Sequence, residues 1–195
     1  IMRAMDENAQ DLAGVIIEPV MVNPMVYLKR VAPRAYLQKI RDKCSKIGCA
    51  LIIDEVMTSR LSPGGAQELV GVEADITTVG KYFGGGFPFG AFGGKEYWMS
   101  RHDPSHPETI NSGGTFNQNA LCLAATRSVL EELWSPDKCV EHNSRGDRFR
   151  NKINDLSKKH GMPCQACGTG SLITLIWQNE DVTGEVDEDS ASHQL

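Results

Sequence analysis

Short runs of hydrophobic residues, separated by an amphipathic stretch, dominate the first third of this chain. Residues 12–20 and 49–57 are mostly apolar. Runs of this length predict parallel strands that are buried on both faces. Between them, 33–47 repeats apolar residues at helical spacing, and Gly48 follows as a helix stop. The order strand, helix, strand predicts a right-handed parallel crossover of the doubly wound α/β kind.

Shorter elements follow along the rest of the chain. Residues 76–79 and 87–93 predict two strands on either side of a glycine-rich turn. A helical pattern covers 119–133, and a polar, basic stretch from 136 onward indicates a helix with a solvated face. Residues 172–177 predict a last strand. The whole pattern is typical of an α/β protein.

Lys81 is the first candidate for chemistry, because it stands where the 76–79 strand opens onto Gly84, Gly85 and Gly86. An amine at a strand end, beside backbone that a ligand can approach closely, can reach a cofactor and lose its proton in a partly dry site. For this motif alone, the alternative is a solvated lysine in a turn, since most lysines lie at the surface.

Two carboxylates end the 49–57 run and form the second candidate. Open α/β sheets place ligand chemistry at the carboxyl ends of their strands, so we expect Asp54 to project into a crevice. The same run with Glu55 also resembles the magnesium-binding strand of a P-loop nucleoside triphosphatase, in which Glu55 would orient water. That alternative lacks a phosphate loop, because Tyr82 follows Gly80–Lys81 where the motif needs serine or threonine.

Six motifs resemble the class III, fold-type I aminotransferases that use pyridoxal phosphate, with the glutamate-1-semialdehyde aminomutase branch as the nearest likeness. In chain order they are 13–20, 51–57, 64–67, 77–86, 88–94 and 113–115. Each motif is weak alone, but their shared order and spacing make the resemblance specific. It implies a fold-type I transferase: the second half of the large domain, with a mixed, mostly parallel sheet whose 87–93 strand is antiparallel, and the start of a small α+β C-terminal domain.

The resemblance also implies roles for residues around the cofactor ring. Lys81 would form a Schiff base with pyridoxal 5'-phosphate and later move a proton, and Asp54 would stabilise the protonated pyridine nitrogen. Val56 would pack on the ring face. Glu18 would order the hydrogen bonds beneath the ring, and Asn23 would bind its phenolic oxygen.

Thr115, with Gly114, precedes the helical pattern of 119–133. Small residues before a helix N-terminus can bind an anion, whereas a plain helix cap is the alternative. The resemblance implies that Thr115 binds the phosphate of the neighbouring subunit's cofactor. It therefore implies a homodimer with shared sites.

The implied reaction moves an amino group between a small amine or amino acid and a keto or aldehyde compound. An aminomutase would return the amine to an adjacent carbon of the same molecule, and both reactions stay open. Departures from the aminomutase branch favour the broader transaminase class; they are Val22, Met25, Ser59 and Gln118. A third hypothesis is a catalytically inert truncated homologue, because the family's first half and the end of its small domain have no counterpart here.

Composition restricts the partners and the location. The chain has 195 residues, is 41% hydrophobic and carries a net charge of −5, without a basic stripe. These features argue against a nucleic-acid partner and favour small-molecule chemistry. Six scattered cysteines indicate a reducing compartment, and the single Cys164-x-x-Cys167 pair does not predict a metal site. With no signal peptide or membrane-spanning run, we expect a cytoplasmic protein, or an organellar one if a transit peptide has been lost.

The expected organisation has three parts. Residues 1–134 correspond to the C-terminal half of the cofactor-binding large domain, and 135–179 to the start of the small domain. Residues 180–195 are acidic and polar and predict a disordered tail. We expect the chain to be a piece of a larger protein.

Overall fold

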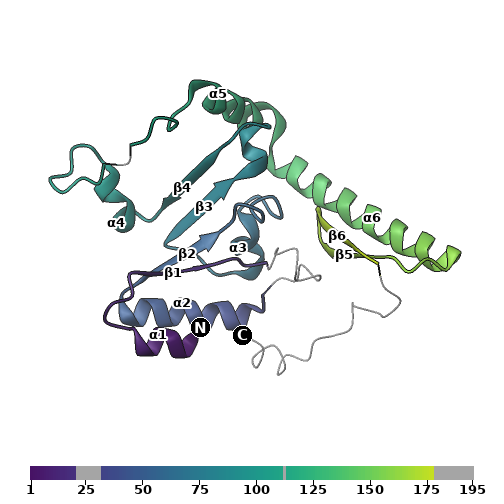
Figure 1. Cartoon of the computed structure of the whole chain (residues 1–195), viewed down its shortest axis with the longest axis horizontal. Coiled ribbons are helices and arrows are strands. Elements are labelled where there is room, and N and C mark those ends of the chain that lie inside the picture. Colours follow the sequence, from purple (N-terminus) through teal and green to yellow (C-terminus); the bar gives the residue numbers. More distant parts are fainter. Residues whose placement is uncertain (21–31, 112, 178–195) are drawn as a thin grey trace.

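The computed structural model describes residues 1–20, 32–111 and 113–177. Two groups of elements can be followed in it: a four-stranded sheet with its helices, and a long helix with a hairpin (Figure 1). Within the described residues, the helices are α1 (Met2–Glu7), α2 (Arg34–Ile47), α3 (Gly65–Val70), α4 (Glu96–Met99), α5 (Ala120–Ser128) and α6 (Pro136–His160). The strands are β1 (Gly14–Ile17), β2 (Ala50–Asp54), β3 (Ile76–Gly80), β4 (Gly90–Gly94), β5 (Gln165–Thr169) and β6 (Leu172–Ile176). Shorter helical turns are η1 (Lys81–Gly84), η2 (Ser100–His102) and the π-helical η3 (Val129–Leu133).

The sheet has the order β1-β2-β3-β4. The first three strands are parallel, and β4 runs antiparallel to β3. The predicted mixed, mostly parallel sheet is therefore confirmed. Helix α2 connects β1 to β2 and ends at Gly48, whose φ of 78° is the left-handed conformation that glycine adopts readily.

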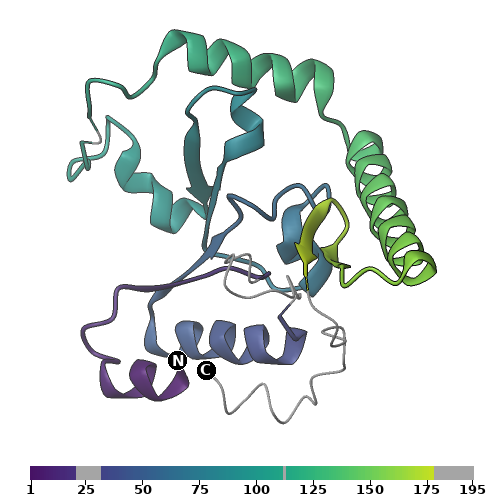
Figure 2. The same ribbon diagram turned by 45° about the vertical axis from the view of Figure 1, so that its right-hand side comes forward.

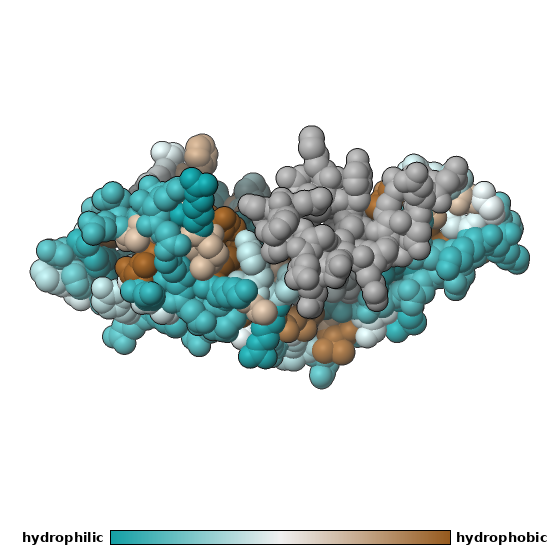
Figure 3. Space-filling model, turned by 90° about the horizontal axis from the view of Figure 1, so that it is seen from below, coloured by the Kyte–Doolittle hydropathy of each residue, from teal (hydrophilic) through white to brown (hydrophobic). Residues whose placement is uncertain are grey.

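One face of the sheet is covered by helices. Leu51 and Ile53 of β2 pack with Leu37 and Ile40 of α2 in one hydrophobic cluster, and Val70 of α3 joins it. Figures 1 and 2 both show α1 and α2 lying alongside each other. Seen from the side of these helices, the surface is mainly hydrophilic with separate hydrophobic groups (Figure 3). This side therefore has the amphipathic arrangement of ordinary surface helices.

The other face of the sheet is less covered by the described elements. Successive residues of a strand point to opposite faces, so Ile16, Ile52 and Asp54 lie on this side. Ile16 is 62% exposed. The expectation that the first strand is buried on both faces is wrong for the described part of the chain, because β1 is an edge strand here and no described helix covers this face. The predicted strand also shortens, from 12–20 to four residues.

Helix α6 begins at Pro136, as the change in composition predicts, and its N-cap is the Ser135 hydroxyl. The hairpin β5–β6 lies along α6 in Figures 1 and 2. Asn154 joins the two, since its side chain exchanges two hydrogen bonds with the backbone of Ala166. The domain boundary at 134 stays a prediction, and the tail 180–195 lies outside the described residues. In the described part of the chain, no helix has the length and apolar character needed to cross a bilayer.

Candidate active site

Asp54 and Lys81 lie at the same edge of the sheet. Asp54 is the last residue of β2, and Lys81 is the first residue after β3. These strands are parallel neighbours, with Asp54 opposite Thr78. Adjacent strands lie about 4.8 Å apart, so the acid and the lysine are carried on neighbouring strand ends. The structure thus places the two residues that the sequence singles out on the ends of adjacent strands.

Two hydrogen bonds orient Asp54. Its Oδ1 accepts the Val56 backbone N–H at 2.9 Å and the Thr78 hydroxyl at 3.1 Å. The residue is half-buried. Among the described residues, no lysine, arginine or histidine forms an ion pair with it. A carboxylate that is fixed but lacks its own cation can accept a cationic group from a ligand.

Val56 packs beside Gly80, the residue before Lys81. A Cβ added at Gly80 would lie 3.6 Å from Val56 Cγ1 and 3.0 Å from the Phe89 carbonyl oxygen. Glycine therefore permits this close approach of β4 to β3. Beyond Asp54 the ladder continues, because Glu55 N donates to Thr78 O at 3.0 Å. The residue that the resemblance assigns to the ring face thus lies next to the lysine-bearing segment.

The glycines after Lys81 turn the chain back toward β4. Gly85 and Gly86 have φ values of 60° and 94°, which residues with side chains rarely adopt. A Cβ on Gly84 would lie only 2.8 Å from Phe89 Cβ. The turn expected from this glycine-rich segment is therefore present, and it ends in β4 at Gly90 instead of the predicted start at Phe87.

Glu55 has a structural role. It is fully buried, and its two oxygens accept hydrogen bonds from the backbone N–H groups of Ala66 and Gln67 and from the Thr58 hydroxyl. These contacts anchor the start of α3. A carboxylate committed in this way cannot orient a water molecule, so the nucleoside triphosphatase alternative loses the residue that it requires.

Glu18 also lies at the carboxyl edge. It directly follows β1. Ile17 pairs with Ile53, and Glu18 and Asp54 are the residues that follow this pair on the two strands. Glu18 is exposed. Asn23, which the resemblance assigns to the cofactor's phenolic oxygen, lies outside the described residues.

Thr115 belongs to the segment that leads into α5. In Figures 1 and 2, the segment that leads into α5 runs on the outer side of β4. Thr115 and Gly114 are exposed. The first free N–H groups of α5, from Leu121 and Cys122, donate to the Asn119 side chain. The helix N-terminus therefore has the plain cap that was the alternative, and any anion contact by Thr115 must come from its own hydroxyl or loop.

Sequence reasoning missed Thr78 and a cluster around Tyr82. The signal for Thr78 was a hydroxyl side chain within the predicted 76–79 strand, three residues before Lys81; its place opposite Asp54 is given by the register in the structure. Tyr82 donates its hydroxyl to Ser59 Oγ at 3.0 Å. Burial raises the pKa of Tyr82 to about 12, although Ser59 and Arg60 act to lower it. The phenol therefore remains a hydrogen-bond donor at neutral pH. No local pattern in the sequence indicates this cluster.

The sequence of this chain also matches a known protein family. Residues 1–190 match the family model described as aminotransferase class III. The chain belongs to the class III aminotransferases. Enzymes of this family use pyridoxal phosphate.

Similar proteins include both kinds of enzyme that the sequence leaves open. The chain is 38% identical over 176 residues to the beta-phenylalanine transaminase of Variovorax paradoxus, covering 89% of this chain and 40% of that protein. It is 40% identical over 184 residues to the glutamate-1-semialdehyde 2,1-aminomutase of a Sulfurihydrogenibium species, covering 93% and 42%.

A solved structure described as a transaminase with PLP bound matches with a TM-score of 0.80 at 30% identity, covering 91% of this chain and 41% of that one. The chain thus spans about two fifths of the length of these relatives. The predicted fold-type I fold is confirmed.

Proposed function

We propose that this chain takes part in pyridoxal-phosphate-dependent transfer of an amino group, with Lys81 as the covalent attachment point for the cofactor. The observation that carries the proposal is the position of Lys81 and Asp54 on the ends of two adjacent parallel strands. Family membership supports the reaction class.

The residues at this edge fit the cofactor chemically. Asp54 is oriented by Thr78 and Val56 and has no cationic partner among the described residues, so it suits the protonated ring nitrogen. Val56 offers an apolar surface beside Gly80 for the ring face. When bound, pyridoxal phosphate supplies an electron-withdrawing ring. Lys81 Nζ would hold the cofactor at its aldehyde carbon, with loss of water, until the amine of the substrate displaces it. The freed lysine would then take a proton from the amine-bearing carbon of the substrate.

Transamination between two substrates is preferred over an aminomutase reaction. The departures from the aminomutase branch include Ser59. Its hydroxyl accepts a hydrogen bond from the hydroxyl of Tyr82, the residue that follows Lys81. A small amine or amino acid would be the donor, and a keto or aldehyde compound the acceptor. A rearrangement of one substrate, without any second substrate, is the outcome that would favour the aminomutase.

Thr115 extends the proposal to a homodimer. It is exposed, and the segment that leads into α5 runs on the outer side of β4 (Figure 1), so this segment is available to another copy of the chain. We propose that its hydroxyl and the Gly114 backbone contact the cofactor phosphate in the neighbouring subunit. Analytical ultracentrifugation tests the dimer, and Thr115→Val tests the contact, since it replaces the hydroxyl with a methyl group of similar size. A monomer, or unchanged cofactor affinity in the variant, would contradict this part.

The decisive experiment is to trap the cofactor on the 195-residue chain. The chain is mixed with pyridoxal phosphate, reduced with borohydride, digested and analysed by mass spectrometry. We expect the reduced label on Lys81, together with a visible absorbance band that reduction removes. Lys81→Arg is the matched control, because it keeps the positive charge but cannot form the adduct. A separate, unreduced sample is mixed with a primary amine to test whether the amino group is transferred to the cofactor.

The possible results separate the hypotheses. Label on Lys81 followed by amino transfer supports the proposed function. Label on Lys81 without any transfer supports the catalytically inert homologue. Label distributed among other lysines, and retained in Lys81→Arg, would reject the assignment of Lys81.

A further inference from the structure

The backbone of Lys81 has an unusual conformation. Its φ is 52°, and among the residues that the structure describes Gln118 is the other residue with a side chain and a positive φ. Such a conformation is unfavourable for a residue with a Cβ and persists only where the surroundings hold it. The Lys81 side chain is exposed. The contacts that hold its backbone must therefore come through neighbouring residues.

Tyr82, the next residue, is held on several sides. Its hydroxyl donates to Ser59 Oγ at 3.0 Å. Its ring centroid lies 4.2 Å from that of Phe83 and 5.2 Å from that of Trp134. The guanidinium carbon of Arg60 lies 5.3 Å from the centroid of the Tyr82 ring, within the range of a cation–π contact. The residue after the lysine is thus held by contacts from three parts of the chain.

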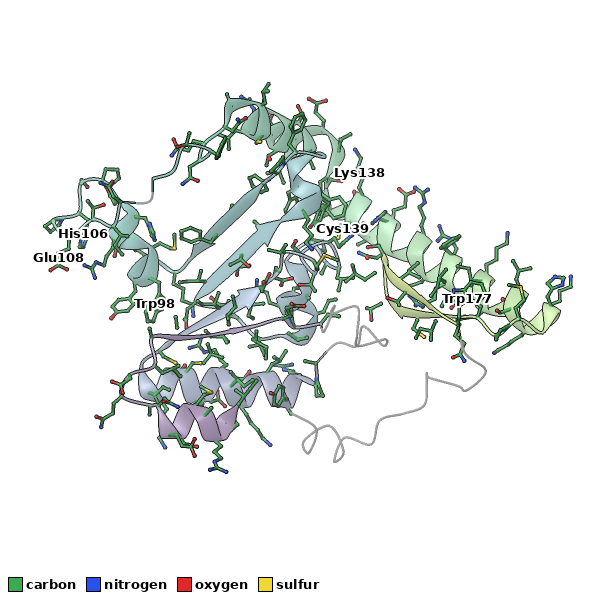
Figure 4. All side chains as sticks on the ribbon, in the orientation of Figure 1. Trp98, His106, Glu108, Lys138, Cys139 and Trp177 are labelled. Atoms are coloured by element: carbon green, nitrogen blue, oxygen red, sulfur yellow. The ribbon has the colours of Figure 1, made fainter. Side chains whose placement is uncertain are left out.

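Arg60 connects this arrangement to helix α6. Its Nη2 lies 2.7 Å from Nε2 of His142. Its carbonyl oxygen accepts hydrogen bonds from the side chains of Asn143, at 2.8 Å, and Cys139, at 3.3 Å. Cys139 lies near the start of α6, where that helix meets the rest of the chain (Figure 4). Arg60 therefore contacts the Tyr82 ring on one side and α6 on the other.

One buried atom of Arg60 is left without a hydrogen bond. Its Nε has no partner among the described residues. A buried N–H without a partner is unfavourable, and in native proteins such groups are few. The side chain is therefore placed by the Tyr82 ring and by His142, not by complete hydrogen bonding. The contacts of Arg60 thus fix the position of its side chain, although one buried N–H group stays without a hydrogen bond.

We infer that Tyr82 is a positioning residue for Lys81 and that Arg60 couples it to α6. We name Ser59, Arg60 and Tyr82 the tyrosine clamp. The clamp holds the backbone of Tyr82. It therefore keeps the backbone of Lys81 in its left-handed conformation and fixes the direction in which the Lys81 side chain leaves the end of β3. A displacement of α6 would be transmitted through Arg60 to the lysine. This inference rests on the proposed role of Lys81 as the attachment point.

The test compares two amine probes at one lysine. Labelling with pyridoxal phosphate and borohydride depends on how the Lys81 amine is positioned. Labelling with limited acetic anhydride depends only on how exposed the amine is. Mass spectrometry gives the ratio of the two labels at Lys81, with Lys152 on α6 as internal reference. Tyr82→Phe removes the hydroxyl but keeps the ring. Tyr97→Phe is the matched control, because the same atom is removed from a tyrosine that is 80% exposed.

We expect Tyr82→Phe to lower the label ratio at Lys81 about fivefold, the change that corresponds to one lost hydrogen bond. Tyr97→Phe should leave it unchanged. Ser59→Ala should match Tyr82→Phe, and the double variant should fall no further, because both changes remove the same hydrogen bond. A purely structural role would lower both labels or the unfolding temperature without changing the ratio. An unchanged ratio in Tyr82→Phe would overturn the inference.

A second measurement separates failure of the inference from failure of the proposed function. If the unaltered chain shows no preference for pyridoxal phosphate at Lys81, the proposed function fails. Amide hydrogen exchange then tests the clamp without cofactor, since Gly85 N donates to Tyr82 O at 3.1 Å. We expect Tyr82→Phe to speed exchange at Gly85 about fivefold, while Tyr97→Phe does not. Equal protection at Gly85 in both variants would reject the clamp.

Discussion

The two ends of the sheet hold their acids in opposite ways. Asp75 lies just before β3, at the amino edge, and Asp54 ends β2 at the carboxyl edge. Asp75 is buried, accepts the Leu51 N–H at 2.8 Å and pairs with Arg41 at 2.6 Å and with Lys95 at 3.2 Å. Asp54 is half-buried and has two hydrogen bonds, but no ion pair within the described part of the chain.

The difference separates a structural acid from a candidate ligand-binding one. A buried carboxylate with two cations and an amide has its charge compensated inside the fold. A carboxylate that is oriented but uncompensated is stable in the half-exposed state and gains a partner only when a ligand brings one. The amino edge therefore serves stability, whereas the carboxyl edge carries the candidate binding acid.

The largest expected effect comes from removing Asp75. Asp75→Ala leaves Arg41, whose side chain is only 14% exposed, without its partner, and breaking a buried pair costs about 3–5 kcal/mol. Urea denaturation at pH 7 should show a loss of this size. Glu73→Ala is the control, since it removes an acid that is 81% exposed from the same segment. A loss below that of Glu73→Ala would contradict the structural role.

The pH dependence of this effect follows from the pKa of Asp75. Burial acts to raise it, but the hydrogen bonds from Leu51, Arg41 and Lys95 outweigh burial and hold the pKa below its ordinary value. The stabilisation is therefore complete above the unfolded pKa of about 3.9. It is lost as pH falls through the lower folded pKa. The difference in stability between the wild type and Asp75→Ala should shrink in that acidic range.

The next largest effect is expected on binding and not on stability. Asp54→Asn keeps an oxygen for the Thr78 and Val56 donors but removes the charge. We expect the unfolding free energy to change by less than about 0.5 kcal/mol, and amino transfer to fall about 100-fold or more, because the ring nitrogen loses its counter-charge. Stopped-flow absorbance measures the transfer. Asp155→Asn, an exposed acid on α6, is the control, and equal activity of the two variants would reject the assignment.

The contrast between the edges was only partly predictable from sequence. Asp54 follows a continuous apolar run, and Lys81 follows a short β-prone one, so both strand ends could be located in advance. The environment of Asp75 could not, because Arg41 is 34 residues away and Lys95 follows a different strand. The buried role of Glu55 was equally hidden, since two of its three donors, Ala66 N and Gln67 N, come from the start of α3, 11 and 12 residues along the chain. Local pattern locates strand ends, whereas side-chain partners depend on tertiary packing.

Glu55 sharpens the comparison, because it is a structural acid beside the candidate binding one. Glu55→Gln leaves a single acceptor oxygen where the carboxylate accepts from Ala66 N, Gln67 N and Thr58 Oγ1. At least one buried donor then lacks a partner, which costs about 1–3 kcal/mol. Thermal unfolding should register the loss, and the label at Lys81 at temperatures well below unfolding should not change. Glu141→Gln, on an exposed part of α6, serves as control; a variant as stable as this control would contradict the anchoring role.

The smallest effect is expected at His142 of α6, whose contact with Arg60 should respond to pH. Burial, followed by the charges of Arg60 and Arg145, lowers the pKa of His142. Neutral His142 can accept from Arg60, whereas the protonated ring cannot. Since the folded pKa is depressed, this stabilisation is complete above the unfolded value of about 6.5 and is lost as pH falls through the folded pKa.

His142→Gln tests this response, because the amide oxygen can accept from Arg60 but does not titrate. The wild type should lose about 1 kcal/mol or less, the size of one hydrogen bond, between pH 7.5 and pH 5 relative to the variant. Urea denaturation across this range measures it, with His160→Gln at the exposed end of α6 as control. Parallel pH profiles for all three proteins would show that His142 carries no pH response. A near-neutral response that survives in Asp75→Ala and disappears in His142→Gln would assign it to the contact between Arg60 and His142. The acid response would then belong to Asp75 at the amino edge.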